Sequence, residues 1–432
     1  MDSTLKAELK GVDKTVWLAV MVAALGYFVD IYDLLLFSIV RVSSLKGIGV
    51  AESELLDKGV LLINTQMAGL LIGGVLWGVL GDKKGRLSVL FGSIFLYSAA
   101  NLLNAFVQNI EQYAVLRFIA GIGLAGELGA GITLISEILP KRLRGFGTTI
   151  VASIGILGAV FGGIIGDLFH WRTAYIIGGS MGFLILLLRV GVRESGLFSK
   201  VCEEDSVSRG DFFSLFKTRA TLSKYLAVIL IGVPIWYVVG ILVTFTPEFG
   251  KAWNMVDLPT AGRAVMFTYI GLAVGDFASG LMSQLAQSRK KVILLYILLT
   301  AAMVAVHLVV SRQSSTLYYA MCVLMGFGAG YWAMFVTVAA EQFGTNIRST
   351  VTTSAPNFVR GAVIPLAFLF QTGAARFGVN TAGIMVGFLS FGVALFALSR
   401  LEETFHKDLD YLEGEEERDQ TPRGVSEAGF AG

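Results

Sequence analysis

The stretch GVLGDKKGR, residues 78–86, lies between two long apolar runs of the chain. Gly85 permits a tight turn there, because glycine tolerates backbone conformations that other residues avoid. Asp82 and Arg86 are placed to pair with helix ends on the far side of a cleft and to release those ends when the cleft opens. We therefore predict a gating role for these three residues. A basic cytoplasmic loop with no gating role is the alternative.

The apolar runs on either side of this stretch predict helices that cross a membrane. The chain of 432 residues is 55% hydrophobic and 15% charged, whereas a soluble domain is about 45–50% apolar and about 25% charged. Each run has about 20 residues, the length that a helix needs to span a bilayer. We predict an all-α membrane protein with twelve transmembrane helices, near 17–43, 59–80, 87–108, 113–138, 146–168, 173–190, 224–247, 262–285, 292–311, 316–341, 350–374 and 380–400.

Two acid–base pairs with the same spacing indicate that the chain consists of two related halves. Glu137 and Arg144 follow the fourth run, and Glu341 and Arg348 follow the tenth, at a common offset of 204 residues. We predict a gating role for these four residues as well. Transporters built from such halves hold their site between them, near the middle of the bilayer. The predicted parts are an N-terminal six-helix half (1–190), a cytoplasmic central loop (191–223), a C-terminal six-helix half (224–400) and a cytoplasmic, partly disordered tail (401–432).

The basic residues predict how the chain is oriented. They gather in the loops after the second, fourth and eighth runs and in the central loop, as is typical of cytoplasmic loops. We expect a multi-pass protein of the cell (inner) membrane with both termini in the cytoplasm. The net charge of +2 is small and says nothing about nucleic acid, and we expect no nucleic acid partner. The expected partners are the bilayer, protons and a small-molecule substrate, and we expect a monomer.

The motifs do not indicate an enzyme. The sequence has no metal-ligand spacing, no nucleophile–base set and no nucleotide-binding loop, so we predict no catalytic residues, no metal site and no cofactor. The two cysteines do not form a disulfide framework. We therefore expect a proton gradient, rather than nucleotide hydrolysis, to drive the protein.

Four charged residues in the first and fourth runs are candidates for coupling to protons. Asp30 and Asp33 share one helix face, and a charge at the centre of a spanning helix costs about 2.5–3.5 kcal/mol. At about 1.5 Å per residue, Arg117 falls at the outer level of Asp33, and Glu127 at the middle level of Asp30. A buried carboxylate beside an arginine stays ionised, and it takes a proton when that partner leaves. A permanent ion pair between the two helices is the alternative.

Arg360 in the eleventh run is the candidate for binding substrate, at the depth estimated for Asp30 and Glu127. Arginine cannot lose its proton in a protein, so Arg360 needs a permanent partner or an anionic ligand. Its planar fork suits a carboxylate or a phosphate. Asn357, nearby on the same run, is placed to add a hydrogen bond. Four aromatic residues are further candidates for the substrate site: Tyr32, Trp236, Tyr237 and Trp332.

Residues 78–86 closely resemble the signature loop of the major facilitator superfamily, G-x-L-x-D-R/K-x-G-R. With the twelve spans, this resemblance covers nearly the whole chain. It implies two pseudo-symmetric six-helix halves that transport by alternating access. Residues 117–145 are similar to the metabolite:proton symporter branch, and the spacing of Asp30, Tyr32 and Asp33 resembles proton:aromatic-acid and proton:phosphate symporters.

The start of the eleventh run adds an expectation about the substrate. Glu341, Thr345 and Arg348 look like a stretch of organic-ion transporters in which the residue twelve positions after the arginine selects the charge of the substrate. That residue is Arg360 here, so the resemblance implies a small organic anion. The predicted function is proton-coupled symport of a carboxylate-type metabolite.

Three other functions stay open. Residues 158–163 resemble a motif of proton-driven efflux antiporters, although Ala159 replaces its proline. A phosphate:proton symporter would fit the first run, but the seventh run lacks the acidic residue which that family uses. A non-transporting receptor on the same fold would need no set of buried acids and arginines.

Overall fold

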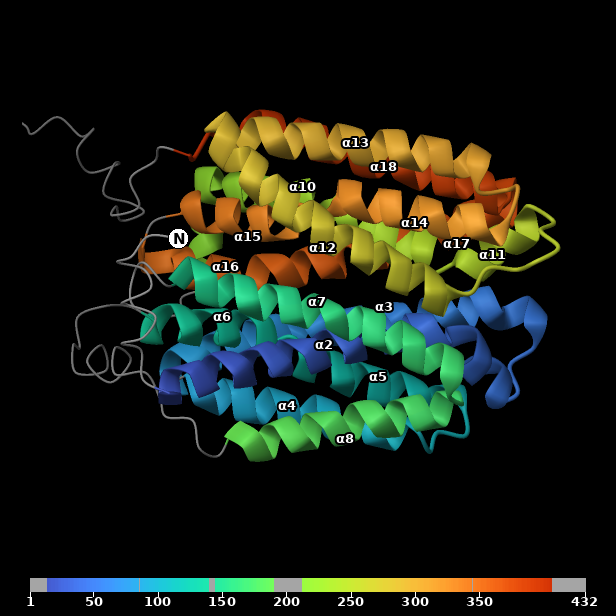
Figure 1. The fold of residues 1–432 in the computed structure, drawn as a ribbon, viewed down its shortest axis with the longest axis horizontal. Helices are drawn as coiled ribbons and strands as arrows, with labels where there is room; N and C mark the ends of the chain where they lie inside the picture. Colours follow the sequence, from blue (N-terminus) through green and yellow to red (C-terminus); the bar gives the residue numbers. More distant parts are fainter. Residues whose placement is uncertain (1–13, 85, 140–143, 190–211, 344, 406–432) are drawn as a thin grey trace, which may run out of the picture.

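A computed structural model describes residues 14–84, 86–139, 144–189, 212–343 and 345–405. Their helices run roughly along the long axis of the molecule (Figure 1). The N-terminal series is α2 (Lys14–Gly47), α3 (Leu55–Lys84), α4 (Arg86–Asn104), α5 (Ile110–Leu124), α6 (Glu127–Ile138), α7 (Arg144–Leu168) and α8 (Trp171–Arg189). The C-terminal series is α10 (Arg219–Tyr237), α11 (Thr246–Ala252), α12 (Ala261–Ala286), α13 (Arg289–Val310), α14 (Ser315–Ala329), α15 (Trp332–Glu341), α16 (Thr345–Gly361), α17 (Val363–Phe377) and α18 (Val379–Arg400).

These helices coincide with the twelve predicted spans. Within the described residues, 11 helical stretches are long and apolar enough to cross a membrane, and Ser88–Asn104 is a shorter apolar helix. The prediction of an all-α membrane protein with twelve transmembrane helices is therefore confirmed. Polar side chains mark several helix starts: Asn109 and Ser288 each accept a hydrogen bond from a backbone N–H of the first turn, at 2.9 and 3.1 Å.

Several spans are interrupted along their length. The fourth span breaks between α5 and α6, the tenth between α14 and α15, and the eleventh between α16 and α17. The seventh changes from α10, which contains Pro234, to a π-helical segment, η3 (Val238–Val243). Interrupted helices leave backbone groups without their usual partners, and transporters use such places to build binding sites.

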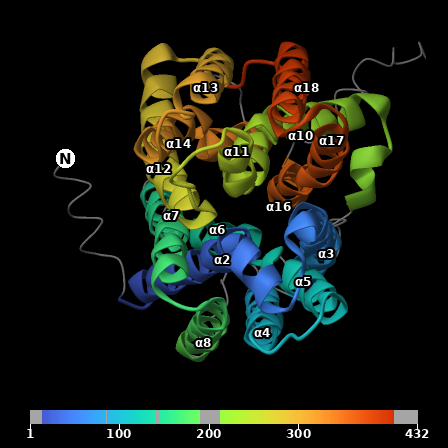
Figure 2. The same ribbon diagram turned by 90° about the vertical axis from the view of Figure 1, so that its right-hand side faces the viewer.

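The two series of helices form two groups that lie against each other. Figure 2 shows the C-terminal series above the N-terminal series, and α7 packs against both α2 of its own group and α12 of the other. We call these groups the N-terminal and C-terminal halves. The exact domain boundaries stay a prediction, since residues 190–211 of the central loop and 406–432 of the tail lie outside the described residues.

The same close helix contact occurs in both halves. Gly73 of α3 lies against the backbone of Ile122 in α5, and Gly275 of α12 lies against the backbone of Phe327 in α14. A side chain at either glycine would collide with the neighbouring helix. Small residues at such crossings let membrane helices approach closely. The repeated contact agrees with the pseudo-symmetry that the sequence predicts.

Candidate functional site

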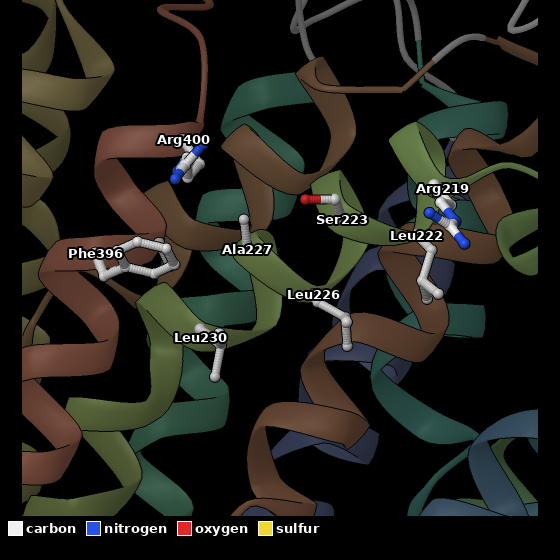
Figure 3. A pocket seen from close by; sticks show the side chains of 9 residues that line it. Arg219, Leu222, Ser223, Leu226, Ala227, Leu230, Phe396 and Arg400 are labelled. Carbon is white, nitrogen blue, oxygen red and sulfur yellow. The ribbon is translucent and has the colours of Figure 1, made fainter.

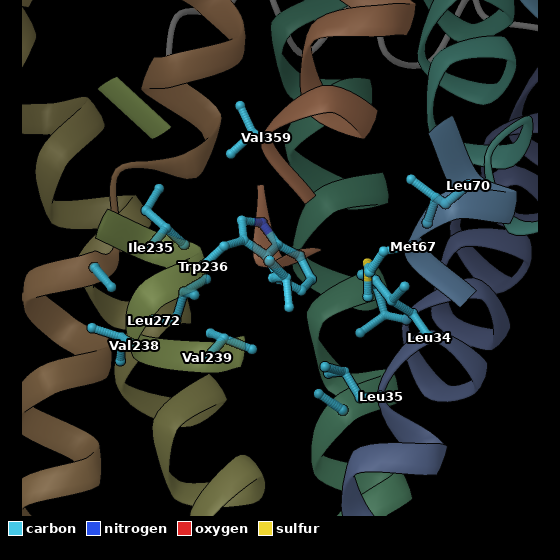
Figure 4. Close-up of a cluster of buried hydrophobic side chains, with 14 of the residues drawn as sticks. Leu34, Leu35, Met67, Leu70, Ile235, Trp236, Val238, Val239, Leu272 and Val359 are labelled. Carbon is cyan, nitrogen blue, oxygen red and sulfur yellow. The ribbon is translucent and has the colours of Figure 1, made fainter. Parts of the chain in front are cut away.

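The boundary between the halves is largely apolar near its centre. Trp236 is only 4% exposed and lies between side chains of the two halves (Figure 4). Residues of the N-terminal half in this cluster are Leu34, Leu35, Met67 and Leu70, and those of the C-terminal half are Ile235, Val238, Val239, Leu272 and Val359. This position is compatible with the predicted role of Trp236 at the substrate site, and that role stays a prediction.

Two opposite charges are buried near this boundary. Asp30 of α2 is 0% exposed and Arg360 of α16 is 1% exposed. The arginine is the charge that acts most strongly on the aspartate. Yet neither oxygen of Asp30, and neither Nε nor Nη1 of Arg360, has a hydrogen-bond partner within the described residues. The pair therefore spans the two halves without direct contact, and its polar atoms are available to a ligand or to water.

Trp332 lies beside this arginine. The Arg360 guanidinium is 5.8 Å from the centre of the Trp332 ring, within cation–π range. Trp332 begins α15, and Oδ1 of Asp276 in α12 accepts a hydrogen bond from the backbone N–H of Ala333 at 3.0 Å. A carboxylate stabilises a helix N-terminus, so Asp276 helps to position Trp332. Asp276 was not among the predicted site residues, although an acid within the eighth apolar run was a signal for it.

Asp33 and Arg117 lie within electrostatic range of each other, as the depth estimate predicts, but they are not hydrogen-bonded. Both side chains are fully buried, and the arginine is the charge that acts most strongly on the aspartate. Nη1 of Arg117 donates instead to Oδ1 of Asn101 at 3.1 Å. Both oxygens of Asp33 lack a hydrogen-bond partner in the described part of the chain. Asn101 was not predicted to belong to the site.

Glu127 has a partner that the sequence analysis did not propose. Its two carboxylate oxygens accept hydrogen bonds from Nη1 and Nη2 of Arg189, the last residue of α8. Both side chains are nearly fully buried. Glu127 also acts electrostatically on Asp30, in keeping with the predicted common level, but its hydrogen bonds go to Arg189. Arg189 was missed because an arginine at the end of an apolar run usually marks the membrane surface.

Three other predicted substrate residues hydrogen-bond to the backbone. The hydroxyl of Tyr32 donates to the carbonyl of Ala174 at 2.8 Å, and that of Tyr237 donates to the carbonyl of Gly383 at 2.8 Å. Each of these bonds stays within one half. The Asn357 amide donates across the boundary to the carbonyl of Ala125 at 3.0 Å, at the break between α5 and α6.

Most predicted gating residues lie outside the side chains that the structure describes. These residues are Asp82, Gly85, Arg86, Glu137, Arg144 and Arg348. Glu341 is described, and it accepts hydrogen bonds from Arg289 at 3.3 and 3.4 Å and from the hydroxyl of Thr404 at 2.6 Å. None of the three residues belongs to the N-terminal half, so this contact does not itself join the halves.

Ion pairs join the halves at the end of the bundle that carries α11 and lies opposite the start of α2 (Figure 1). We call it the α11 end. Arg41 of α2 pairs with Glu248 of α11 at 2.6 Å, and Asp167 of α7 pairs with Arg263 of α12 at 2.5 Å. Arg41 is fully buried. These contacts hold the two halves together at the α11 end, and none of the four residues was predicted.

A pocket of about 320 Å³ lies elsewhere, between α10 and α18 (Figure 3). Arg219 and Arg400 flank it, and Leu226, Leu230 and Phe396 line its apolar part. None of the predicted site residues belongs to this pocket. Among the described residues there is also no group of three His, Cys, Asp or Glu side chains that could hold a metal ion.

The fold is that of an α-helical membrane protein, and the family match and the relatives below identify a transporter rather than an enzyme. Residues 16–368 match the model of the Major Facilitator Superfamily. This match covers most of the chain, and the chain therefore belongs to that superfamily.

Relatives of known name are metabolite transporters. A putative metabolite transport protein of Haemophilus influenzae is 28% identical over 391 residues, which cover 84% of this chain and 92% of the relative. A gentisate transporter of Corynebacterium glutamicum is 25% identical over 406 residues, which cover 90% of this chain and 88% of the relative. The crystal structure of a D-xylose-proton symporter matches with a TM-score of 0.69 at 17% identity, covering 90% of this chain and 99% of that one.

Proposed function

We propose that this transporter carries a small organic anion, specifically an aromatic carboxylate, together with protons, and that it works as an importer by alternating access. The proposal needs no cofactor, because a proton gradient supplies the energy. Placement in the inner membrane, cytoplasmic termini and a monomeric state stay predictions that accompany it.

The observation that carries the proposal is the buried guanidinium of Arg360. Arginine stays charged in proteins, and burying a charge is costly unless it is paired. Nε and Nη1 have no hydrogen-bond partner among the described residues. A carboxylate can accept two parallel hydrogen bonds from a guanidinium, and the neighbouring Trp332 ring offers an apolar face to an aromatic substrate.

The acids near Arg360 and Arg117 can couple substrate transport to protons. While Asp30 is ionised, its carboxylate partly balances the charge of Arg360. Protonation of Asp30 removes that balance and leaves the guanidinium to attract the substrate carboxylate. Substrate and proton then load together, because burial penalises an uncompensated charge of either sign. Asp33 lies one helical turn from Asp30 and within the field of Arg117. We propose that the transported proton first binds Asp33 and then passes to Asp30.

The relatives support the choice of substrate class. The name of the Corynebacterium protein gives gentisate, an aromatic carboxylate, as its substrate. Gentisate is therefore the first probe, followed by other aromatic acids, aliphatic mono- and dicarboxylates, phosphate and amines. A ligand that binds the folded protein raises its unfolding temperature, so a thermal-shift screen of the purified protein ranks these classes.

Arg360→Ala tests the assignment. We expect gentisate to bind this variant about 30-fold more weakly or worse, because loss of a buried charge-assisted contact costs about 2–5 kcal/mol. Arg312→Ala is the control, since Arg312 is exposed and contacts the Trp253 ring at the α11 end. Unchanged affinity in a folded Arg360→Ala protein would overturn the substrate assignment.

A further inference from the structure

One face of α4 is polar although it is completely buried. Tyr97, Ser98, Asn101 and Asn104 are each 0% exposed. Their spacing places them along one side of the helix over a length of about 10 Å. The strip ends at Asn104, the last residue of α4, which lies at the α11 end. We call these four residues the α4 polar strip.

Most polar atoms along this strip have no partner in the protein. Within the described residues, no hydrogen bond is made by the hydroxyls of Tyr97 and Ser98, by Nδ2 of Asn101 or by either polar atom of the Asn104 side chain. Leaving one buried polar group unsatisfied costs about 1–3 kcal/mol. Native proteins satisfy nearly all such groups, with ordered water where protein groups do not serve. The strip therefore requires water.

The strip also reaches the coupling acid. Asn101 accepts a hydrogen bond from Arg117 at 3.1 Å, and both oxygens of Asp33 are unpaired in the part of the chain that the structure describes. The groups that act on Asp33 are Arg117 of α5, the side-chain amide of Asn101, which is close to Asp33 but not within ordinary hydrogen-bond distance, and Asp30 of α2. The unpaired atoms thus extend from Asn104 to the carboxylate of Asp33.

Two glycines of α8 let that helix lie directly against these polar atoms. Helix α8 packs against α4 (Figures 1 and 2). A Cβ added to Gly178 would collide with Oδ1 of Asp33, and a Cβ added to Gly182 would collide with the hydroxyl of Ser98. The two glycines are one helical turn apart, so they face the same strip. Any larger residue at these positions would displace the polar atoms.

Hydroxyl groups continue the polar region toward the α11 end. The hydroxyls of Tyr113 and Tyr175 lie 2.6 Å apart, and that of Tyr113 donates to the hydroxyl of Ser44 at 3.2 Å. Gln108 and Asn109, in the loop that follows α4, are exposed. The polar region thus comes close to the surface at the α11 end.

We propose that the α4 polar strip holds a chain of water molecules that carries protons from the α11 end to Asp33. This path lies inside the N-terminal half and is separate from the substrate path between the halves. A proton passes along the hydrogen-bonded waters and forms an O–H bond on the Asp33 carboxylate, and the last water returns to its neutral state. The fixed positive charge of Arg117 then repels any further proton that enters the strip. This inference rests on the proposed function.

The first test is transport by Asn101→Leu in proteoliposomes. An apolar side chain of similar size removes the hydrogen-bonding groups at the middle of the strip. We expect gentisate accumulation driven by a proton gradient to fall at least about tenfold, as expected for loss of a positioned proton-transfer path. Exchange of labelled for unlabelled gentisate without a gradient should stay near the wild-type rate, because it needs no net proton movement.

Two variants control for structural damage. Asn101→Ser keeps a polar group and leaves room for water, so it should retain coupled uptake. Thr300→Val removes a buried hydroxyl of α13 that donates only within its own helix, and it should also retain coupled uptake. Coupled uptake by Asn101→Leu at the wild-type rate would overturn the inference and leave the proposed function intact. A wild-type protein without proton-driven uptake would overturn both.

The second test needs no mutation. Brief X-ray radiolysis of the wild-type protein in water modifies buried side chains that contact bound water. We expect Tyr97 to be modified faster than Tyr237, a buried tyrosine whose hydroxyl bonds to the carbonyl of Gly383. Equal protection of the two tyrosines would overturn the inference even if Asn101→Leu fails to fold.

Discussion

Glu127 and Arg189 form a doubly hydrogen-bonded ion pair inside the N-terminal half, and both side chains are nearly inaccessible to solvent. The pair joins α6 to α8, and Gly26 of α2 passes directly beside it without a side chain. This geometry favours a structural role for Glu127. Asp30 and Asp33 are then the stronger candidates for proton coupling, because their carboxylates are not paired in this way.

Removal of one member of this ion pair should destabilise the folded protein more than removal of both. Arg189→Met leaves a buried, uncompensated carboxylate, and we expect a loss of about 3–5 kcal/mol in the free energy of unfolding. The double variant Glu127→Gln with Arg189→Met should recover part of that loss. Unfolding in detergent of Glu127→Gln, Arg189→Met and the double variant measures these losses, with Arg312→Met as the surface control. Losses that simply add in the double variant would contradict a direct ion pair.

Asp33→Asn should separate proton coupling from substrate binding. Asparagine has nearly the same shape but cannot take up and release a proton. We expect gradient-driven gentisate accumulation to disappear while gentisate exchange persists. Asp257→Asn, at an exposed carboxylate that contacts Ser315, is the matched control. Full accumulation by the Asp33 variant would exclude Asp33 as the coupling acid.

The contact between Arg41 and Glu248 should control opening at the α11 end. Arg41 also donates to the backbone carbonyl of Thr244 at 3.3 Å, so its loss removes more than one contact between the halves. We expect Arg41→Ala to shift the protein toward states in which the α11 end is open. Spin labels at the exposed residues Ser53 and Val256, in a background with serine at both cysteines, report the separation of the halves.

Arg172→Ala is the control for this measurement. Arg172 donates to the carbonyls of Ala105 and Val107, which belong to its own half. The distance between the labels should lengthen in the Arg41 variant and stay unchanged in the Arg172 variant. An unchanged distance in Arg41→Ala would show that this ion pair does not hold the α11 end closed.

Glu403 should make stability depend on pH at the start of α13. Partial burial raises the pKa of Glu403, but hydrogen bonds from the Ser288 hydroxyl and from the backbone N–H groups of Arg289, Phe405 and Lys290 outweigh this effect, so the pKa lies below its usual value. A carboxylate with a lowered pKa in the folded state stabilises the protein above the pKa of the unfolded state, and this contribution disappears as the pH falls through the folded-state pKa.

Glu403→Gln should therefore destabilise the protein at neutral pH by about 0.3–1 kcal/mol, the usual range for a charge at a helix end. The difference from the wild type should shrink as the pH is lowered toward the acid range. Thermal unfolding across pH, with the exposed Glu402 changed to Gln for comparison, measures this. A difference that does not vary with pH would rule out titration of Glu403 as its cause.

The sequence predicted the fold because the apolar runs have the length of a bilayer and repeat in two halves. It also placed Asp33 and Arg117 at a common level, since a straight helix converts residue number into depth. The same arithmetic grouped Glu127 with Asp30 and Arg360, but it contains no information about which way a side chain points around the helix axis. Glu127 turns instead to Arg189.

Other parts of the site depend on tertiary contacts that no local pattern encodes. Asp276 acts at the start of α15 because the tenth span breaks there, and neither the break nor the helix beside it follows from the apolar run itself. Asn357 was expected to contact substrate, yet its amide bonds to the carbonyl of Ala125 at another break. The pairing of Arg41 with Glu248 requires that α2 and α11 meet across the boundary.

The most direct test of coupled transport is the pH inside proteoliposomes during gentisate uptake. An inward gentisate gradient is imposed on weakly buffered vesicles with equal pH on both sides, and vesicles without protein correct for passive entry of the acid. We predict acidification of the interior by the wild-type protein and none by Asp33→Asn. Gentisate uptake by the wild-type protein with no change of internal pH would contradict proton symport.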